Sequence, residues 1–493
     1  MRERLRPAAA SLAALLLCLL FCVPAAPASA GSGRYAAIDD YVRDRMEATR
    51  VPGLAYAVVG PEGPLHQRSW GTDGHGEPVT AATPFLWGSV AKPVAATGVM
   101  ALVQTGRLGL DDKVADHLPG FRFGGTAHAA EVTVRHLLDQ TAGLPESATF
   151  KVADCLDADC PRPAERLAAL DDVRPLGPPG TAYAYTSANY LVLAALVEAV
   201  TGRPFAEYLR SAVLDPAGMD GAIADAASAR KRNLPPGHQL LWGFPSAIAD
   251  GFDDSGASYG YLGGDLNDLA AFASFQLRSG RTAGGDTVLT PESVRLMREE
   301  GELRPTGAGT GYGLGWRVGG LDAPLDDAVW HTGATFGYSG MLFLLPEQGT
   351  ALVLHQNLHG LLHDGAVMQV GFGAARLLAG GGAPAASSAS TYHLAVWGTT
   401  VLALALSAAA VRSAFLLRRP APGSRLRRTA AAAAWALAGA LPWTAAVPLV
   451  VQMGPGQLSN WFPDIFIALC AAALAGAATA VLRLVRALRG ASR

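Results

Sequence analysis

A serine and a lysine three residues apart are the first candidate for chemistry in this sequence. Ser89 and Lys92 belong to the apolar run FLWGSVAK at residues 85–92, and their spacing places both side chains on one face of a helix. A serine hydroxyl is a weak nucleophile that needs a base beside it. Burial lowers the pKa of a lysine and turns it into such a base. The pattern predicts acyl transfer by Ser89, with Lys92 accepting its proton.

The spacing alone is not specific, because Ser228 and Lys231 repeat it. That copy lies within a run of positive charge and indicates a solvated surface. Lys92 has apolar neighbours instead. Pro93 is tolerated only near the start of a helix, so Ser89 is expected at the helix mouth, beside the positive end of the dipole.

Tyrosine and histidine motifs later in the chain could complete the site. Tyr185 lies in YAYTSANY, on an expected loop before a helix, where a phenol can relay protons to a leaving group. His331 lies in WHTGA and could orient a carboxylate or the tyrosine. The strand edge at Thr332 and Gly333 could hold an acyl group by backbone pairing. The N–H of Ala334, with that of the nucleophile, would form an oxyanion hole.

In this order the three motifs resemble those of serine β-lactamases and penicillin-binding proteins. The likeness is greatest to the branch with class C β-lactamases, D-Ala-D-Ala carboxypeptidases, D-aminopeptidases and related esterases. It extends over the whole region outside the apolar ends, through Val132–Leu138, Thr141–Pro145, Pro179–Thr181, Asp268–Phe272 and Tyr312–Trp316. The resemblance implies a β-lactamase-like α/β (α+β) fold: an antiparallel sheet flanked by helices, with an inserted α-helical lobe. It also implies two-step acyl transfer by Ser89, Lys92 and Tyr185 without a cofactor.

Two departures from the family pattern bear on the substrate. Ser187 stands where the family usually has an asparagine, and His331 stands where true lactamases often have a lysine. We expect both residues, with Thr332, Gly333 and Ala334, to face the substrate or its oxyanion. The changes make efficient penicillin hydrolysis doubtful and favour an amide or ester substrate, such as a D-amino acid peptide of the cell wall.

The elements that must position these residues come from both ends of the central region. Strands are expected over 53–59 and 66–70, a helix over 90–105, and helical stretches over 132–139 and 191–201. Strands return over 313–318, 340–345 and 350–354. We therefore expect one sheet built from both chain ends, in a domain covering residues 31–378. The Gly- and Ala-rich residues 379–392 form a flexible linker.

Both ends of the chain are apolar. Residues 1–30 combine a basic start, a short apolar core and Ala28-Ser29-Ala30, the parts of a cleavable signal peptide. The membrane region, residues 393–493, contains three stretches long enough to span a bilayer, about 394–411, 430–453 and 461–482. Arginines lie between the first two stretches and after the third. Arginine-rich segments beside membrane helices stay in the cytoplasm. We expect a cell-membrane protein with its catalytic domain outside and its C-terminus in the cytoplasm.

Charge and cysteine content restrict the remaining possibilities. The region between the apolar ends is acidic, which argues against a nucleic-acid partner. Cys155 and Cys160 are the two cysteines expected outside the membrane, and such a pair favours a disulfide.

Several alternatives stay open. The G-x-S-x-G around Ser258 fits a nucleophile elbow, and His355, His359 and His363 recur at helical spacing, as metal ligands can. The same site could serve a transpeptidase or cyclase. A non-catalytic sensor that binds cell-wall peptide or β-lactam is the other alternative.

Overall fold

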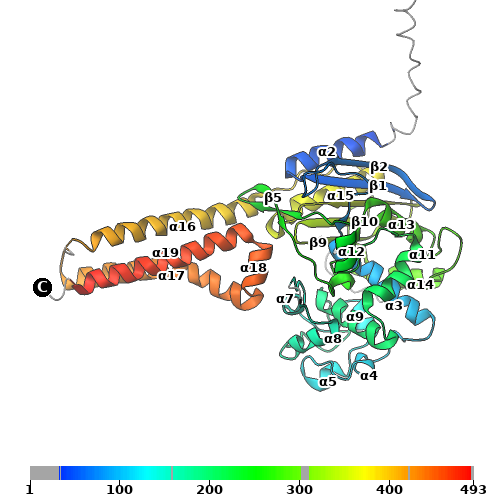
Figure 1. The fold of residues 1–493 in the computed structure, drawn as a ribbon, viewed down its shortest axis with the longest axis horizontal. Coiled ribbons are helices and arrows are strands. Elements are labelled where there is room, and N and C mark those ends of the chain that lie inside the picture. The colour runs from blue at the N-terminus through cyan, green and yellow to red at the C-terminus, as the bar shows by residue number, and fades with distance from the viewer. Residues whose placement is uncertain (1–32, 34, 157–158, 301–309, 420–421, 490–493) are drawn as a thin grey trace, which may run out of the picture.

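The structure is a computed structural model that describes Gly33 and residues 35–156, 159–300, 310–419 and 422–489. The expected signal peptide, residues 1–30, lies outside the described residues. A globular domain and a bundle of long helices make up the described chain, with the bundle extending away from the domain (Figure 1).

A seven-stranded antiparallel sheet forms the centre of the globular domain, in the order β2-β1-β11-β10-β9-β8-β7. The first two strands of the chain pair with the last one, so the prediction of a sheet built from both chain ends is confirmed. Every residue of β1 and β10 is buried, because helices cover both faces of the sheet. The strands are β1 Gly53–Gly60, β2 Gly63–Gly71, β7 Thr310–Tyr312, β8 Arg317–Gly319, β9 Val329–Thr335, β10 Tyr338–Leu345 and β11 Thr350–Gln356.

Helices pack on both faces of the sheet (Figure 1). The helices α2 (Ala36–Thr49) and α15 (Asp364–Leu378) pack against each other and share a core with one face of β10 and β11. On the opposite face, α13 (Leu266–Leu277) packs against β1 and β11. That second core continues without a break into the helical lobe, so the sheet and the lobe share one core.

The helical lobe is inserted between the early and late strands, as the sequence predicts. Its elements are α4 Val114–His117, α5 Gly125–Ala129, α6 Val134–Leu138, α7 Thr149–Val152, α8 Pro163–Arg166, α9 Ser187–Thr201, α10 Phe205–Leu209, α11 Asp215–Ala217 and α12 Ala226–Lys231. The domain also contains two small antiparallel sheets. In one, β3 (Phe85–Leu86) pairs with the sequence-distant β6 (Gly263–Gly264), and in the other the consecutive strands β4 (Gly237–Leu241) and β5 (Phe244–Ala249) pair. Helix α14 is Pro291–Arg295.

One predicted strand is wrong. Residues 313–318 do not form a continuous strand, because a turn after Tyr312 separates β7 from β8, and the two pair as an antiparallel hairpin. Gly315 adopts a φ of +90° in this turn, a conformation that glycine tolerates. The apolar run resembles a strand because Leu314 and Trp316 are both fully buried in the core.

Three helices are long and apolar enough to cross a membrane, α16 (Ser390–Leu416), α17 (Arg425–Met453) and α19 (Pro463–Arg489). A short helix, α18 (Pro455–Trp461), joins α17 to α19 on the side of the globular domain (Figure 1). The third span was expected to start at Trp461, but the structure places this residue at the end of α18 instead. Residues before α16 run along α15, where the Ser387 N–H donates to Gln369 Oε1 at 2.8 Å.

Candidate active site

Ser89 lies at the junction of a strand and a helix. The β3–β6 pairing and a bond from the Trp87 N–H to the carbonyl of Leu262 (3.0 Å) fix the chain just before it. A 3-10 turn, Gly88–Val90, then leads into α3 (Ala91–Gln104). Ser89 therefore lies just before the start of α3, as expected.

Lys92 is fully buried, and its amine is directed at the serine. Its Nζ lies 2.9 Å from Ser89 Oγ, 3.3 Å from Ser187 Oγ and 2.9 Å from the carbonyl oxygen of Tyr259. Burial, and secondarily the charge of Arg317, hold the pKa of this lysine well below its usual value. A neutral amine at this distance can accept the serine proton.

Tyr185 closes the other side of the serine. Its side chain hydrogen-bonds with Ser89, and its ring centroid lies 4.9 Å from Lys92 Nζ. Burial raises the pKa of this phenol above its ordinary value, so at neutral pH it is a proton donor. Thr186 caps α9 by accepting a bond from the Ala188 N–H (3.3 Å), which fixes the loop that carries the tyrosine.

Backbone N–H groups of Ser89 and Ala334 meet because glycines allow β9 to approach the serine turn. A Cβ on Gly333 would lie 2.4 Å from the Ser89 nitrogen, and a Cβ on Gly88 would lie 2.1 Å from the Ala334 nitrogen. Both distances are shorter than any real contact, so only glycine fits. The two N–H groups form the candidate oxyanion hole.

Replacing Gly333 with alanine is therefore expected to separate β9 from the serine turn. We expect kcat/KM to fall about a hundredfold or more, the loss associated with one misplaced oxyanion donor. Steady-state kinetics of the purified full chain checks this. The control is Gly365→Ala, where no heavy atom lies within 4 Å of the new methyl. Equal activity of Gly333→Ala and wild type would contradict the assignment.

His331 lies behind the site and does not line the cavity. It is 1% exposed, its Nδ1 lies 2.6 Å from the Thr332 carbonyl and its Nε2 lies 3.3 Å from the Tyr312 hydroxyl. Its ring centroid is 6.0 Å from that of Tyr185. Burial keeps its pKa well below the usual value, so the ring is neutral. The hydrogen bond of His331 goes to Tyr312 and not to Tyr185, so a role in orienting Tyr185 stays a prediction. The buried ring does not face a substrate in the cavity, contrary to expectation.

Arg317 is a site residue that the sequence analysis missed. It lines the cavity from β8, with its guanidinium carbon 5.2 Å from the Tyr185 ring centroid and 5.4 Å from that of Trp330. Its charge lowers the pKa of Lys92 and of His331. The signal in the sequence was an arginine directly after Tyr312–Trp316, the family-like stretch.

Ser89, Tyr185 and Arg317 line a cavity of about 400 Å³. It lies between the β9 edge of the sheet and the helical lobe. In the described chain, β8 pairs with β9 only at Val329 and Trp330, so residues 332–335 present a free backbone edge to the cavity. The lining residues are Ser89, Glu146, Thr149, Phe150, Ala153, Asp154, Tyr185, Ser187, Tyr259, Gly260, Tyr261, Arg317, Thr332, Gly333, Ala334, Thr335, His359, Leu361, Asp364, Met368 and Trp461.

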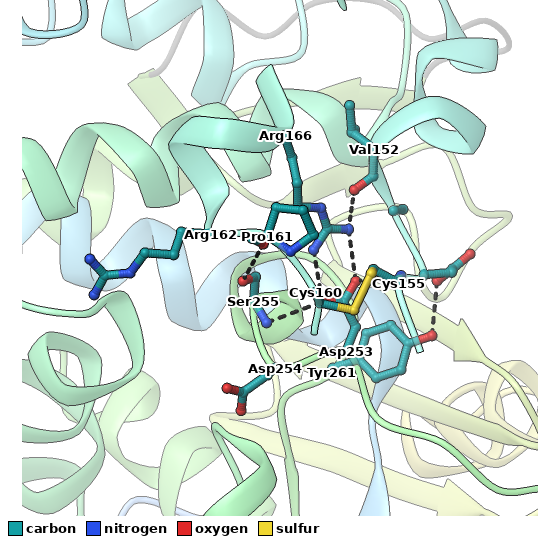
Figure 2. Close-up of polar contacts among 12 residues, drawn as sticks. Val152, Cys155, Cys160, Pro161, Arg162, Arg166, Asp253, Asp254, Ser255 and Tyr261 are labelled. Carbon is teal, nitrogen blue, oxygen red and sulfur yellow. Dashed lines mark hydrogen bonds and ion pairs between the residues drawn. A yellow bond between two sulfur atoms is a disulfide. The ribbon is translucent and has the colours of Figure 1, made fainter. Parts of the chain in front are cut away.

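A buried ion pair between Arg166 and Asp253 lies beside a disulfide (Figure 2). Cys155 and Cys160 are disulfide-bonded, with Cα atoms 5.8 Å apart. Arg166 donates to both carboxylate oxygens of Asp253 at 2.8 Å. The Tyr259 hydroxyl donates to the same carboxylate, while the backbone carbonyl of this tyrosine accepts from Lys92 Nζ. The ion pair therefore positions a direct contact of the lysine.

Replacing Arg166 with methionine should destabilise the domain by about 3–5 kcal/mol, because it leaves the fully buried Asp253 carboxylate unpaired. The expected fall in melting temperature is about 5 °C for a domain of this size, measured by thermal unfolding of the full chain in detergent. Lys113→Met is the control, since it breaks a solvent-exposed pair with Glu131, which is worth about 1 kcal/mol or less. Similar shifts for both variants would contradict the expectation.

The alternative sites do not assemble in the described residues. Ser258 is fully buried on a 3-10 turn that follows coil, not a strand, and does not line the cavity. The expected metal ligands also point to different surroundings: His355 packs on the Phe85 ring at 4.8 Å and His359 on the Trp461 ring at 5.6 Å. No group of three His, Cys, Asp or Glu side chains in the described ranges is arranged to hold a metal ion.

Comparisons with known proteins agree on one family. The Beta-lactamase family profile matches residues 38–370. Penicillin-binding protein 4 of Amycolatopsis lactamdurans is 32% identical over 330 residues, which cover 64% of this chain and 84% of the relative.

Two solved structures share the fold. The octameric penicillin-binding protein homologue from Pyrococcus abyssi superposes with a TM-score of 0.58 at 21% identity, over 70% of this chain and 78% of its own. SurE, solved with D-Leu, superposes with a TM-score of 0.55 at 25% identity, over 72% and 78% of the two chains.

Proposed function

Because this chain belongs to the Beta-lactamase family, we propose that it is a membrane-anchored serine hydrolase that forms an acyl-enzyme on Ser89. The observation that carries the proposal is the fully buried Lys92 amine 2.9 Å from Ser89 Oγ. A buried lysine is costly to keep in a fold, and its pKa is held low by burial and by Arg317. Such an amine is suited to proton transfer from the serine.

The reaction has two steps. Lys92 accepts the proton of Ser89 as the serine oxygen bonds to the substrate carbonyl, and the Ser89 and Ala334 N–H groups stabilise the oxyanion. Tyr185 donates its proton to the leaving amine or alcohol as the carbon–heteroatom bond breaks. It then recovers the proton that Lys92 took from Ser89, because the Lys92 amine lies beside the Tyr185 ring. Water then attacks the ester with the lysine again as base, which releases the acid and restores the serine.

A substrate with a carboxylate beside the scissile bond fits the cavity best. Arg317 offers a guanidinium at one end of the free β9 edge, and a guanidinium binds a carboxylate through two parallel hydrogen bonds. The edge itself can pair with an extended peptide. A D-amino acid peptide has both features, and the structure of SurE with D-Leu supports this class.

The proposed location is the outer face of a cell membrane. Residues 1–30 would direct export. The ends of α16, α17 and α19 that lie away from the globular domain carry arginines, and arginine-rich ends stay in the cytoplasm. The C-terminus is then cytoplasmic and the cavity faces outward, where cell-wall peptides are found.

The test is turnover of N-acetyl-D-Ala-D-Ala by the full chain in detergent, with p-nitrophenyl acetate as a substrate that lacks the carboxylate. Release of D-Ala with repeated turnover supports the proposal. A stable adduct without turnover would favour the sensor alternative, and transfer of the acyl group to an added amine would favour the transpeptidase or cyclase.

The Arg317→Gln variant tests the carboxylate contact. We expect KM for N-acetyl-D-Ala-D-Ala to rise about tenfold or more, because a hydrogen bond between charged groups is lost, while KM for p-nitrophenyl acetate stays within twofold. Removing the positive charge also raises the pKa of Lys92, so the acidic limb of the kcat/KM profile should move to higher pH. Arg230→Gln on the exposed end of α12 is the control, and an unchanged KM in Arg317→Gln would contradict the contact.

A further inference from the structure

The loop between the second and third membrane helices lies against the catalytic domain. Gln457 Nε2 donates to the Ala153 carbonyl at 3.0 Å, and Gln239 Nε2 donates to the Asn460 carbonyl. At the start of α19, the Asp464 carboxylate accepts from the Tyr392 hydroxyl at 2.7 Å and from the Trp242 N–H at 3.0 Å. Both ends of α18 are thus fixed to elements of the globular domain or of α16.

Trp461, the last residue of α18, forms part of the wall of the active-site cavity. Its Nε1 donates to Asp154 Oδ2 at 3.2 Å and to Gln457 Oε1 at 3.0 Å. Its ring packs on Phe336 at a centroid distance of 4.6 Å and edge-on against His359 at 5.6 Å. The indole is therefore held in one orientation, with part of its surface facing the cavity.

Trp461 and Arg317 lie beside opposite ends of β9. Arg317 is the pairing partner of Trp330 near the start of the strand, whereas Phe336 follows its end. Trp330 and Phe336 are six residue steps apart, about 20 Å in an extended strand. A substrate that lies along the free edge with its carboxylate at Arg317 would direct its acyl side toward Trp461.

Several apolar side chains line the cavity together with Trp461. They include Phe150, Leu361 and Met368. The nearby acid Asp154 already has partners on both oxygens, since Oδ1 accepts from Tyr261 at 3.0 Å and Oδ2 from the indole. Asp364 also lines the cavity, with its Oδ1 3.4 Å from His359 Nδ1. The indole of Trp461, with Phe150, Leu361 and Met368, supplies the apolar part of this lining.

We propose that Trp461 is a specificity-determining residue of the Ser89 site, which selects acyl donors that carry an apolar group on the side of the scissile bond away from Arg317. The inference rests on the proposed function and deepens it. A single helix would tether the domain, but only a second and third helix return the chain to the side of the cavity. Two exposed apolar side chains, Val451 on α17 and Ile467 on α19, lie in the helices on either side of α18.

The test compares phosphonylation of Ser89 by two fluorophosphonates, one with a methyl group and one with a phenylpropyl group, using intact mass of the full chain in detergent. In Trp461→Ala the rate constant for the phenylpropyl reagent should fall about tenfold, as for a lost apolar contact in a specificity pocket. The rate constant for the methyl reagent should stay within twofold. Trp461→Phe should recover most of the loss, and Trp397→Ala, an exposed tryptophan of α16, should change neither rate.

The outcomes separate the two proposals. An equal fall for both reagents would overturn the specificity role and leave Trp461 structural, and so would no change for either reagent. Absence of Ser89 labelling in the wild type by both reagents would instead overturn the proposed function, and this inference with it.

Discussion

Replacement of Ser89 with alanine is expected to abolish covalent labelling by a fluorophosphonate and to lower turnover at least a thousandfold. The expectation follows from the site, where Ser89 Oγ is the hydroxyl that contacts both the Lys92 amine (2.9 Å) and Tyr185. In serine hydrolases, loss of the nucleophile removes nearly all catalysis that the catalytic residues provide as a unit. Intact mass spectrometry after labelling gives the first readout and steady-state kinetics the second.

Ser258→Ala is the matched control, because Ser258 belongs to the competing G-x-S-x-G pattern and lies fully buried outside the cavity. This variant should keep the adduct. An adduct that survives in Ser89→Ala but disappears in Ser258→Ala would reverse the assignment. Parallel labelling with a penicillin would separate a D-Ala-D-Ala-like substrate from a simple ester.

Replacement of Lys92 with methionine should lower kcat/KM about a hundred- to ten-thousandfold, the range expected when a general base is removed. Methionine has a similar length and no charge, so the core stays filled. Because labelling also needs a deprotonated serine, the rate of phosphonylation should fall with turnover. The control is Lys231→Met in the second Ser-x-x-Lys pattern, whose lysine is exposed and should be dispensable.

The same variant should change how stability depends on pH. The pKa of Lys92 is lowered in the folded state, so the unfolded chain binds one more proton at any pH between the lowered value and the ordinary value of about 10.5. The stability contribution of Lys92 therefore rises with pH through that window. The difference in melting temperature between wild type and Lys92→Met should rise with pH below about 10.5. A difference that does not vary with pH would mean that the lysine is not buried as a neutral amine.

The arrangement of α18 links the two parts of the molecule. Hydrogen bonds join Gln457 to Ala153 and Trp461 to Asp154. The side chain of Trp461 also lines the cavity. Removing the membrane region would therefore remove a wall of the site along with the anchor. Activity measurements therefore require the full chain in detergent or lipid.

The amino-acid sequence by itself determined the features that depend on short spacing or on composition. Ser89 and Lys92 meet because residues at i and i+3 are neighbours on any helix. The three spans follow from length and apolarity, and the sheet from strands at both ends of the domain. The order of the three motifs along the chain also indicates the family.

Tertiary structure alone decided the contacts between elements far apart in the chain. Trp461 lies 307 positions after Asp154, and no local pattern distinguishes an indole at a membrane surface from one that faces a cavity. Arg317 became a site residue because a hairpin, unexpected from the apolar run, directs it inward. His331 was expected to face the substrate, but the structure places it behind Tyr185 and outside the cavity lining. Each of these positions depends on packing between distant segments, which spacing along the chain does not encode.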